Sequence, residues 1–565
     1  MSIFSTLQIA NNALTASQLG MQVVGNNIAN ANTPGYVRQD MVLTPASTQR
    51  IGGLLMGMGV DVDAVVQRID RFLEERLRNA AADLANGEAQ EKVFLELEAV
   101  VGELSETDLS TSLTGFFGAL HDILNQPESV SVRNLAVLLG ETLSTDVNRL
   151  SRRVYELRAD VNNQITAMQD EINGLLKRVA KLNTDIVAME GGDATSSDAV
   201  GLRDARSEAL ADLAELLAVG TNEQPDGSVT VFSEGDFLVS GGHFREVDVQ
   251  FEPDRGIGSA TLRLAVTEKP LSPSSGKLDG LITARDEILG GFLDNLDEFA
   301  RTLIFEFNRI HSSGQGLSGY AEIRSEFAVE DVNLALDQAG LSYTPVNGSF
   351  QVLVKNKQTG LTQTTDVFVP LNGLDSDMTL EDLRQALDNI DGLQAEIAPS
   401  RELVLRADSP LVEFAFARDS SGTLAALGLG TFFTGTTAGN MGVNQLVRDD
   451  PGKFAASKSG MGADADNAAE LAAFLDRELA SQNNQTISVM YDRLVGEIAQ
   501  SAAVARSVAE GFRVFHQTLE GQHLAITGVS LDEEAVKMIA YQRAFQANAR
   551  LVATLSEMLD VLVNL

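Results

Sequence analysis

IFSTLQIANNALTASQLGMQVVGNNI, residues 3–28, and LDEEAVKMIAYQRAFQANARLVATLSEMLDVLV, residues 531–563, are the two stretches that decide the fold. In both, apolar residues recur in alternating steps of four and three. This mean period of about 3.5 residues keeps one seam of a helix facing a partner helix. An isolated helix of this length is marginal in water, so each seam needs a surface to pack on. We therefore predict that the chain's own ends pair as a coiled coil, or that both ends dock on copies of the same chain.

The predicted seam carries mostly apolar or small side chains. In the N-terminal half it consists of Ile3, Leu7, Ala10, Leu14, Ser17, Met21, Val24 and Ile28. In the C-terminal half it consists of Leu531, Ala535, Met538, Gln542, Phe545, Ala549, Val552, Ser556, Leu559 and Val563. Polar residues in a seam trade stability for register or partner choice, so Ser17, Gln542 and Ser556 indicate assembly contacts. The alternative is a wet inner surface that simply tolerates them.

Composition excludes several classes of function. The chain has 565 residues, which predicts three or more domains, and a formal net charge of −37. Such acidity argues against non-specific binding to nucleic acid and to anionic membrane surfaces. The absence of cysteine rules out disulfides, thiolate zinc sites and cysteine nucleophiles. With no basic signal-peptide start and no apolar run of membrane-spanning length, we expect no membrane insertion. We expect the chain to be cytoplasmic, or exported without a cleaved signal.

Periodicity along the chain predicts helices at both ends and β-rich segments between them. A stripe in steps of four and three from Leu143 to Met189 predicts a long helical rod. Alternating residues predict strands within residues 220–268 and again within 350–416. The fold class that follows is multidomain and mainly α, with β-rich insertions: paired terminal coiled-coil helices, a long helical rod domain and an inserted α+β domain. The predicted parts are 1–60 (N-terminal coiled-coil half and connector), 61–219 (rod, first part), 220–275 (β-rich), 276–317 (rod helix), 318–435 (inserted α+β domain), 436–525 (rod, last part) and 526–565 (C-terminal coiled-coil half).

One short motif follows the first helix. Residues 26–36, NNIANANTPGY, closely resemble the N-terminal signature of bacterial flagellar rod, hook and hook-associated proteins. Residues 541–550, YQRAFQANAR, resemble the partner signature at the C-terminus of that family. These two motifs alone leave rod, hook and junction members of the family open.

Three further blocks distinguish among those members. GKLDGL at 276–281 with Arg285-Asp286, FNRIH at 307–311 and TFFTG at 431–435 resemble the junction proteins of the family, which lie between hook and filament. The length of the chain and its long rod also fit the junction proteins better than the shorter rod proteins.

The resemblance implies a structural subunit of the flagellum. It implies a chain that is exported unfolded by the flagellar type III system and then assembles as a ring of copies at the hook–filament junction. The implied partners are further copies of the chain, the hook protein, the second hook–filament junction protein and an export chaperone at the C-terminal region. The implied localisation is secreted, on the bacterial flagellum. We further predict that the terminal helices become ordered on assembly, when neighbours repay their ordering entropy.

The candidate site residues all belong to this assembly interface. They are Leu7, Leu14, Met21, Val24, Asn26, Asn27, Ile28, Asn30, Asn32, Thr33, Pro34, Gly35, Tyr36, Met538, Gln542, Phe545, Asn548, Ala549, Val552 and Leu559. The four asparagines either cap the helix end or bond to neighbouring subunits through their donors and acceptors. Tyr36 is either a local packing residue or an anchor between subunits. Pro34-Gly35 is the preferred centre of a type II turn.

No motif predicts catalysis, a cofactor or a metal site. The five histidines are scattered, and the chain lacks both cysteine and a His-x3-His pair. We expect His311 to end a helix, where a partial positive charge is favoured. Three alternatives stay open: a flagellar hook or rod protein, an exported hydrolase displayed on a flagellar scaffold with its chemistry in 318–435, and a cytoplasmic coiled-coil scaffold.

Overall fold

The computed structural model describes residues 3–33, 35–51, 54–102, 109–191 and 198–563. The chain folds into two compact units, each assembled from separated stretches of sequence. Unit 1 comprises residues 1–93, 159–285 and 503–565, and unit 2 comprises residues 94–158 and 286–502. Three long helices contribute residues to both units: α2 (Arg71–Gly102), α4 (Val130–Glu190) and α12 (Ile487–Thr527).

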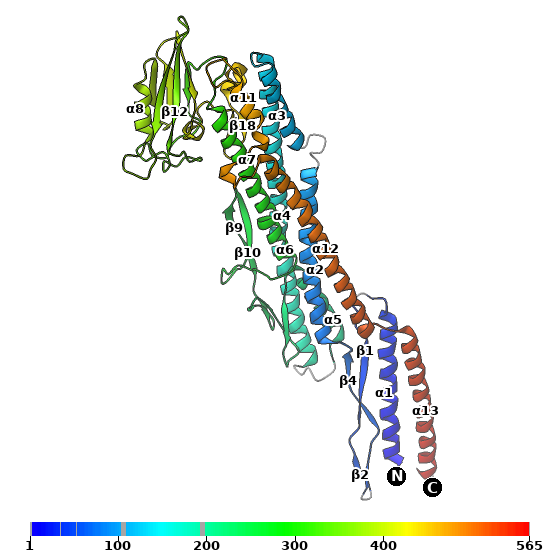
Figure 1. Cartoon of the computed structure of the whole chain (residues 1–565). Helices are drawn as coiled ribbons and strands as arrows, with labels where there is room; N and C mark the ends of the chain where they lie inside the picture. Colours follow the sequence, from blue (N-terminus) through cyan, green and yellow to red (C-terminus); the bar gives the residue numbers. More distant parts are fainter. Residues whose placement is uncertain (1–2, 34, 52–53, 103–108, 192–197, 564–565) are drawn as a thin grey trace. The chain divides into compact units, whose positions relative to one another are not determined.

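Unit 1 holds both chain ends and four antiparallel sheets (Figure 1). The sheets pair β1 with β4, β2 with β3 and β9 with β10, and β5 to β8 form a four-stranded meander. Besides its shares of the long helices, the elements of unit 1 are α1 (Ile3–Asn30), β1 (Gln39–Pro45), β2 (Gln49–Ile51), β3 (Leu54–Met56), β4 (Val60–Gln67), α5 (Val200–Leu216), β5 (Gly220–Glu223), β6 (Val229–Ser233), β7 (Asp236–Ser240), β8 (His243–Phe244), β9 (Val247–Asp254), β10 (Ile257–Leu264), α6 (Lys277–Thr283) and α13 (Leu531–Val563).

Asparagines on α4 fasten the strands of unit 1 to the helix. Asn173 donates to the carbonyl of Val247 and accepts its N–H, both at 2.8 Å. The Asn183 side chain donates to the carbonyl of Val229 at 2.7 Å and accepts the N–H of Val229 at 2.9 Å. Asn162 donates to the carbonyl of Gly258 on β10 and accepts an N–H two residues further along that strand. Each side chain thereby satisfies backbone groups that would otherwise be buried without a partner.

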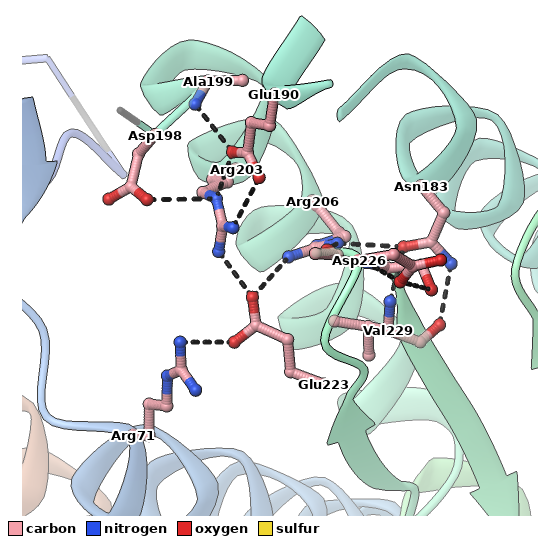
Figure 2. Close-up of polar contacts among 12 residues, drawn as sticks. Arg71, Asn183, Glu190, Asp198, Ala199, Arg203, Arg206, Glu223, Asp226 and Val229 are labelled. Atoms are coloured by element: carbon pink, nitrogen blue, oxygen red, sulfur yellow. Dashed lines mark hydrogen bonds and ion pairs between the residues drawn. The ribbon is translucent and has the colours of Figure 1, made fainter. Parts of the chain in front are cut away.

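A buried ion-pair network joins α4, α5 and the start of the meander (Figure 2). Glu190, at the end of α4, binds Arg203 through both carboxylate oxygens, at 2.7 and 2.8 Å. Arg203 also contacts Glu223 at 2.6 Å, and Arg71 reaches the other oxygen of Glu223 at 2.5 Å. Burial lowers the pKa of the neighbouring Arg206 to about 10. Because Glu190 and Arg203 are buried, removing either of them costs far more than removing a partner of an exposed pair would.

Unit 2 is built around the remaining helices and an inserted β-rich module. Besides its shares of the long helices, its elements are α3 (Leu109–Asn125), the π-helical turn η1 (Ala284–Leu289, shared with unit 1), α7 (Gly290–His311), β11 (Glu322–Arg324), β12 (Gly348–Asn356), β13 (Thr362–Val369), α8 (Leu380–Asp388), β14 (Leu393–Ile397), β15 (Leu403–Ala407), β16 (Val412–Ala417), α9 (Thr423–Leu427), β17 (Phe433–Thr434), β18 (Gly442–Val443), α10 (Gln445–Asp449), η2 (Pro451–Lys453), α11 (Asp466–Ala472), η3 (Phe474–Asp476) and η4 (Ala480–Gln482).

An aromatic cluster forms the core of unit 2 and brings two of the sequence motifs together. The rings of Phe307 and Phe433 have centroids 5.1 Å apart, and Phe116 stacks on Phe432 at 5.5 Å. Asn308, next to Phe307, donates to the carbonyl of Phe433. Its side-chain oxygen accepts the backbone N–H groups of Phe432 and Phe433. The 307–311 and 431–435 blocks are therefore two sides of one packed contact.

The inserted module has two three-stranded sheets and its own core. The sheet orders are β11-β15-β14 and β13-β12-β16. Helix α8 begins with a capping box in which Thr379 and Asp382 bond each other's backbone. The module leaves and rejoins the helical part at one place, since the hydroxyl of Ser313 accepts the N–H of Asp419.

The predicted fold class, mainly α with β-rich insertions and paired terminal helices, is confirmed. Most of the long stripe on α4 is buried, but Met189 at its end is 72% exposed, and the helix is longer than its stripe, at 61 residues. The seven-part division of the chain stays a prediction, because the two units follow packing rather than consecutive segments. Helix α4 ends at Glu190, and residues 192–197 lie outside the described residues.

His311 is the last residue of α7 as expected, but the predicted reason is wrong. The ring is fully buried, its Nδ1 lies 2.9 Å from the carbonyl of Gly430, and its Nε2 accepts the N–H of Ala455 at 3.1 Å. Burial lowers the pKa of His311 to about 4. The hydrogen bond to Gly430 acts in the opposite direction, and the charge of Arg133 lowers the pKa slightly further. The imidazole is therefore neutral and links three segments of unit 2.

Asn162→Ala should destabilise unit 1 by about 2 kcal/mol, because two strand backbone groups lose their partners. The matched control is Asn163→Ala, since Asn163 is exposed on the same helix. Hydrogen exchange of the β9–β10 amides measures the difference. Equal protection of these amides in the two variants would contradict the role of Asn162 in holding β10 on α4.

Acidification should weaken unit 2 through His311. Between the ordinary pKa of 6.5 and the folded value of about 4, the unfolded chain binds a proton that the folded chain excludes. Stability is therefore complete above pH 6.5 and is lost as pH falls through that window, by about 2 kcal/mol between pH 7 and 5. Hydrogen exchange of α7 should show this loss in the wild type and in the exposed-site control His121→Gln, but not in His311→Gln.

Candidate functional site: the terminal helix pair

The two chain ends lie side by side as an antiparallel helix pair within unit 1 (Figure 1). Asn27 of α1 bonds Glu534 at the start of α13, and Gly20, about two turns earlier, faces Tyr541. A methyl group on Gly20 would lie 2.7 Å from the Tyr541 ring, so glycine permits the close approach. The other side of α1 meets the hairpin of β1 and β4, where the side-chain amide of Asn12 donates to the carbonyl of Met58.

The predicted seam of α13 is partly covered within the single chain. Met538, Phe545, Val552 and Leu559 are half-buried as predicted. Between them, the face toward α1 is formed by Glu534, Tyr541, Asn548 and Leu555. The predicted seam residues Leu531, Ala535, Gln542 and Ser556 are exposed in the single chain, and their role in assembly stays a prediction. The apolar pattern did not indicate Glu534 or Asn548, because one is charged and the other is polar.

Asn27 is the polar centre of the pair. Its side chain donates to the carbonyl of Gln39 at 2.9 Å and to the carboxylate of Glu534 at 3.0 Å. Its Oδ1 accepts the N–H of Gln39 at 3.0 Å and the hydroxyl of Tyr36 at 2.8 Å. One fully buried amide therefore ties α1, β1, the connecting turn and α13 together.

Glu534 and Arg38 complete this centre. The Glu534 side chain has no exposed surface, and its Oε1 accepts from Nε and Nη2 of Arg38 at 3.1 and 2.7 Å. Lys537 lies 3.5 Å from the same oxygen and pairs with Asp40 at 2.9 Å. The backbone N–H of Arg38 also donates to the carbonyl of Thr527, the last residue of α12. The position of α13 is thus fixed from three sides.

The turn after α1 matches its prediction. The N–H of Tyr36 donates to the carbonyl of Thr33 at 3.2 Å, and Gly35 has a φ of 73°, as the third residue of a type II turn requires. Pro34 lies outside the described residues. Tyr36 is half-buried, and its pKa is raised to about 12 by burial and by the nearby carboxylates of Asp204 and Glu534. The local-packing role of Tyr36 is therefore present in the folded chain.

The other signature asparagines lie at the surface or near it. The Asn30 side chain donates to the carbonyl of Asn26 at 3.0 Å, while Asn26 and Asn32 are exposed. Of the predicted N-terminal seam, Val24 is buried, Leu7, Leu14 and Met21 are half-buried, and Ile28 is exposed. On α13, the predicted interface residues Asn548 and Ala549 are also half-buried. Their role as contacts between subunits stays a prediction.

The helix pair leaves much apolar surface open. Among the residues of α13 whose side chains the structure describes, only Glu534 and Leu555 are buried. Val536, Ile539, Met558 and Val561 are each at least half exposed. Large apolar side chains exposed along one helix indicate a partner that covers them.

Sequence reasoning missed Arg38, Gln39 and Glu534. The available signal was Glu534, a charged residue at a position of α13 where the helical period predicts an apolar one. A carboxylate on a core face needs a buried cation, and Arg38, two residues after the motif, is one of only two basic residues in the first 60. In the described part of the chain, no three side chains of histidine, aspartate or glutamate gather as a metal site. No described helix combines the length and apolarity needed to cross a bilayer.

Glu534→Gln should loosen the pair, because the buried Arg38 then loses its buried counter-charge and keeps only the exposed carboxylate of Glu533. We expect hydrogen exchange of the α13 amides to rise by about tenfold or more. Glu533→Gln is the matched control: it removes the same charge one residue away, from a side chain that is 62% exposed and also pairs with Arg38. Equal effects of the two substitutions would contradict a special role for the buried carboxylate.

Three family descriptions match separate parts of the chain. Residues 7–36 match "Flagella basal body rod protein", residues 94–324 match "Flagellar hook-associated protein FlgK helical domain", and residues 520–565 match "Flagellar basal body rod FlgEFG protein C-terminal". The first and last matches contain most of α1 and all of α13, which form the pair described above.

Two relatives that align with the chain along almost its whole length have the same name. The chain is 24% identical to flagellar hook-associated protein 1 of Escherichia coli over 585 residues, covering 99% of this chain and 100% of the relative. It is 23% identical to the protein of the same name from Bacillus subtilis, covering 100% of this chain and 98% of the relative. The fold is similar to the flagellar hook junction protein FlgK from Burkholderia pseudomallei, with a TM-score of 0.51, 15% identity, and coverage of 80% of this chain and 100% of that one. Along its whole length the chain therefore resembles flagellar hook-associated protein 1, a structural component of the bacterial flagellum and not an enzyme.

Proposed function

We propose that this chain is a structural subunit of the junction between flagellar hook and filament, and that its terminal helix pair completes its core with copies of itself. The whole-length resemblance supports the place of the subunit in the flagellum. The subunit would form a ring of copies that contacts the hook protein on one side and the second hook–filament junction protein on the other.

One observation carries the assembly mechanism: α13 buries only Glu534 and Leu555 among its described side chains. Helix α13 has 33 residues but packs only one of its faces, on α1. The apolar surface that it buries there is small compared with the conformational entropy that the chain loses when the helix forms. Neighbouring copies would cover Ile539, Met558 and the other exposed apolar residues and supply the missing stabilisation. The helices are therefore expected to gain order when neighbours dock.

Export follows from the same features. A chain without cysteine forms no disulfide that would block passage as an unfolded polypeptide. The exposed apolar residues of α13 would also be available to a dedicated chaperone at the C-terminal region before export through the flagellar type III system. Covering that surface in the cell would prevent premature association of the copies.

The alternatives have weaker support. A hook or rod protein would share both terminal motifs, but the match over residues 94–324 is to the helical domain of the hook-associated class. A hydrolase displayed on the flagellum would place its chemistry in residues 318–435. The titratable groups with shifted pKa in that module are explained by packing: Asp419, for instance, accepts three backbone N–H groups at the start of α9.

Complementation of a strain that lacks this protein tests the proposal. Ile539→Asp should abolish filament attachment while leaving the melting temperature of the purified chain unchanged, because Ile539 is half exposed in the single chain. Gln546→Asp, an equally charged change at an exposed polar position of α13, should leave motility intact. Deletion of residues 531–565 should give a folded, soluble chain that cannot join the flagellum. Normal filaments from Ile539→Asp or from the deletion would overturn the proposal.

A further inference from the structure

Unit 1 contains a cavity of about 240 Å³ lined by residues of α2, α5 and β5. Four arginines border it, two from each helix: Arg71 and Arg78 from α2, and Arg203 and Arg206 from α5. Acidic residues outnumber basic ones by 79 to 42 in the whole chain, yet arginines outnumber glutamates in this lining. The carboxylate contacts of each arginine decide whether the cavity attracts an anion.

One glutamate of the lining is shared by three of the arginines (Figure 2). Glu223 binds Arg71 at 2.5 Å through one carboxylate oxygen and Arg203 at 2.6 Å through the other. Arg203 is further neutralised by Glu190, which binds it through both oxygens. Nη2 of Arg206 lies 3.9 Å from Glu223, too far for a hydrogen bond. Arg206 therefore has no hydrogen-bonded counter-charge among the residues that the structure describes.

Arg206 also has donors to spare. Its residue is 5% exposed, and its Nη1 donates to Oδ1 of Asn183 at 3.0 Å and to the carbonyl of Gly227 at 2.7 Å. A guanidinium has five N–H donors, but Nε and Nη2 of Arg206 donate no hydrogen bond to any described residue. A buried charge without a hydrogen-bonded partner of opposite sign is costly. Arg206 thus presents an unmet demand for an anion beside the cavity.

Arg78 of α2 has the same deficit. Its side chain is 13% exposed, and the nearest described carboxylate, that of Glu74, lies 3.9 Å from Nη1. Its Nη2 donates to the hydroxyl of Thr221 at 3.0 Å. Burial lowers the pKa of Arg78, and the carboxylates of Glu74 and Glu75 offset this effect only in part. Glu74 also lies 4.0 Å from Nε2 of His523, so its contacts are divided.

From these two arginines we infer that the cavity binds a small free oxyanion of the phosphate class, which Arg78 and Arg206 hold between α2 and α5. Guanidinium groups bind tetrahedral oxyanions through paired, charge-assisted hydrogen bonds. Ser207 and Asn222 also line the cavity and add a hydroxyl and an amide, and their side chains bond no other described residue. The volume lies below the about 300–1,000 Å³ typical of pockets for larger ligands, which favours an ion.

The bound anion would supply the counter-charge that neither arginine has at hydrogen-bond distance, and it would fasten α2 to α5 within unit 1. The terminal helix pair contributes none of the residues that hold the anion. The inference is therefore independent of the proposed function.

Titration of the full-length chain with inorganic phosphate tests the inference, with chloride used to hold the ionic strength constant. Calorimetry should show saturable binding of a single phosphate per chain. Arg78→Gln should weaken this binding by about tenfold or more, because charge-assisted hydrogen bonds are lost. Arg76→Gln is the matched control, since it removes the same charge from an exposed side chain of α2 outside the lining, and it should bind phosphate as the wild type does.

A substitution of opposite sign separates an anion site from a cation site and from a general effect of salt. Glu75 is an exposed glutamate of the lining, so Glu75→Gln should leave the fold intact and remove a charge that repels phosphate. Phosphate binding should become severalfold tighter. If circular dichroism shows that Arg78→Gln is unfolded, Glu75→Gln decides alone.

Three results would each overturn the inference. They are the absence of saturable phosphate binding in the wild type, unchanged binding in a folded Arg78→Gln variant, and unchanged or weaker binding in Glu75→Gln.

Discussion

The buried contact among Glu534, Arg38 and Asn27 is the constraint on which the terminal part of this chain depends. A carboxylate without exposed surface is tolerable only when a cation and hydrogen-bond donors surround it. Here the cation comes from the connector after α1, and the amide comes from α1 itself. The first and last helices can therefore pair in one register only, since sliding α13 by a turn would leave both charges buried and unpaired.

The same solution, a side-chain amide that bonds both polar groups of a peptide backbone, recurs through the molecule. Asn27 holds Gln39 of β1, three asparagines of α4 hold β6, β9 and β10, and Asn308 holds Phe433. In each case a helix presents the amide and an extended segment receives it. Helices satisfy their own backbone, so strands that pack on them leave edge groups unpaired unless a side chain supplies partners. These asparagines attach small β segments to long helices without a large sheet.

The sequence predicts the elements that periodicity controls and misses the contacts between distant polar residues. Helix α1, the turn at Gly35, the strands of the meander and the capping box of α8 follow from local pattern and turn chemistry. The seam of α13 does not, because half of its positions are filled by Glu534, Tyr541, Asn548 and Leu555, and only a partner 500 residues away in sequence makes a charge acceptable there. For the same reason the neutral, buried state of His311 depends on Gly430 and Ala455, which no local pattern connects to it.

Acidity and assembly place opposite demands on the chain, and the distribution of residues shows how both are met. A net charge of −37 keeps separate molecules apart, yet the proposed assembly requires the chain to pack closely against copies of itself. Helix α1 carries no charged residue, and it meets α13 through small side chains, as at Gly20. The one strong charge on the shared seam, Glu534, is neutralised within the chain by Arg38. Repulsion is thereby removed from the surface that would approach neighbours in the proposed assembly and is retained elsewhere on the chain.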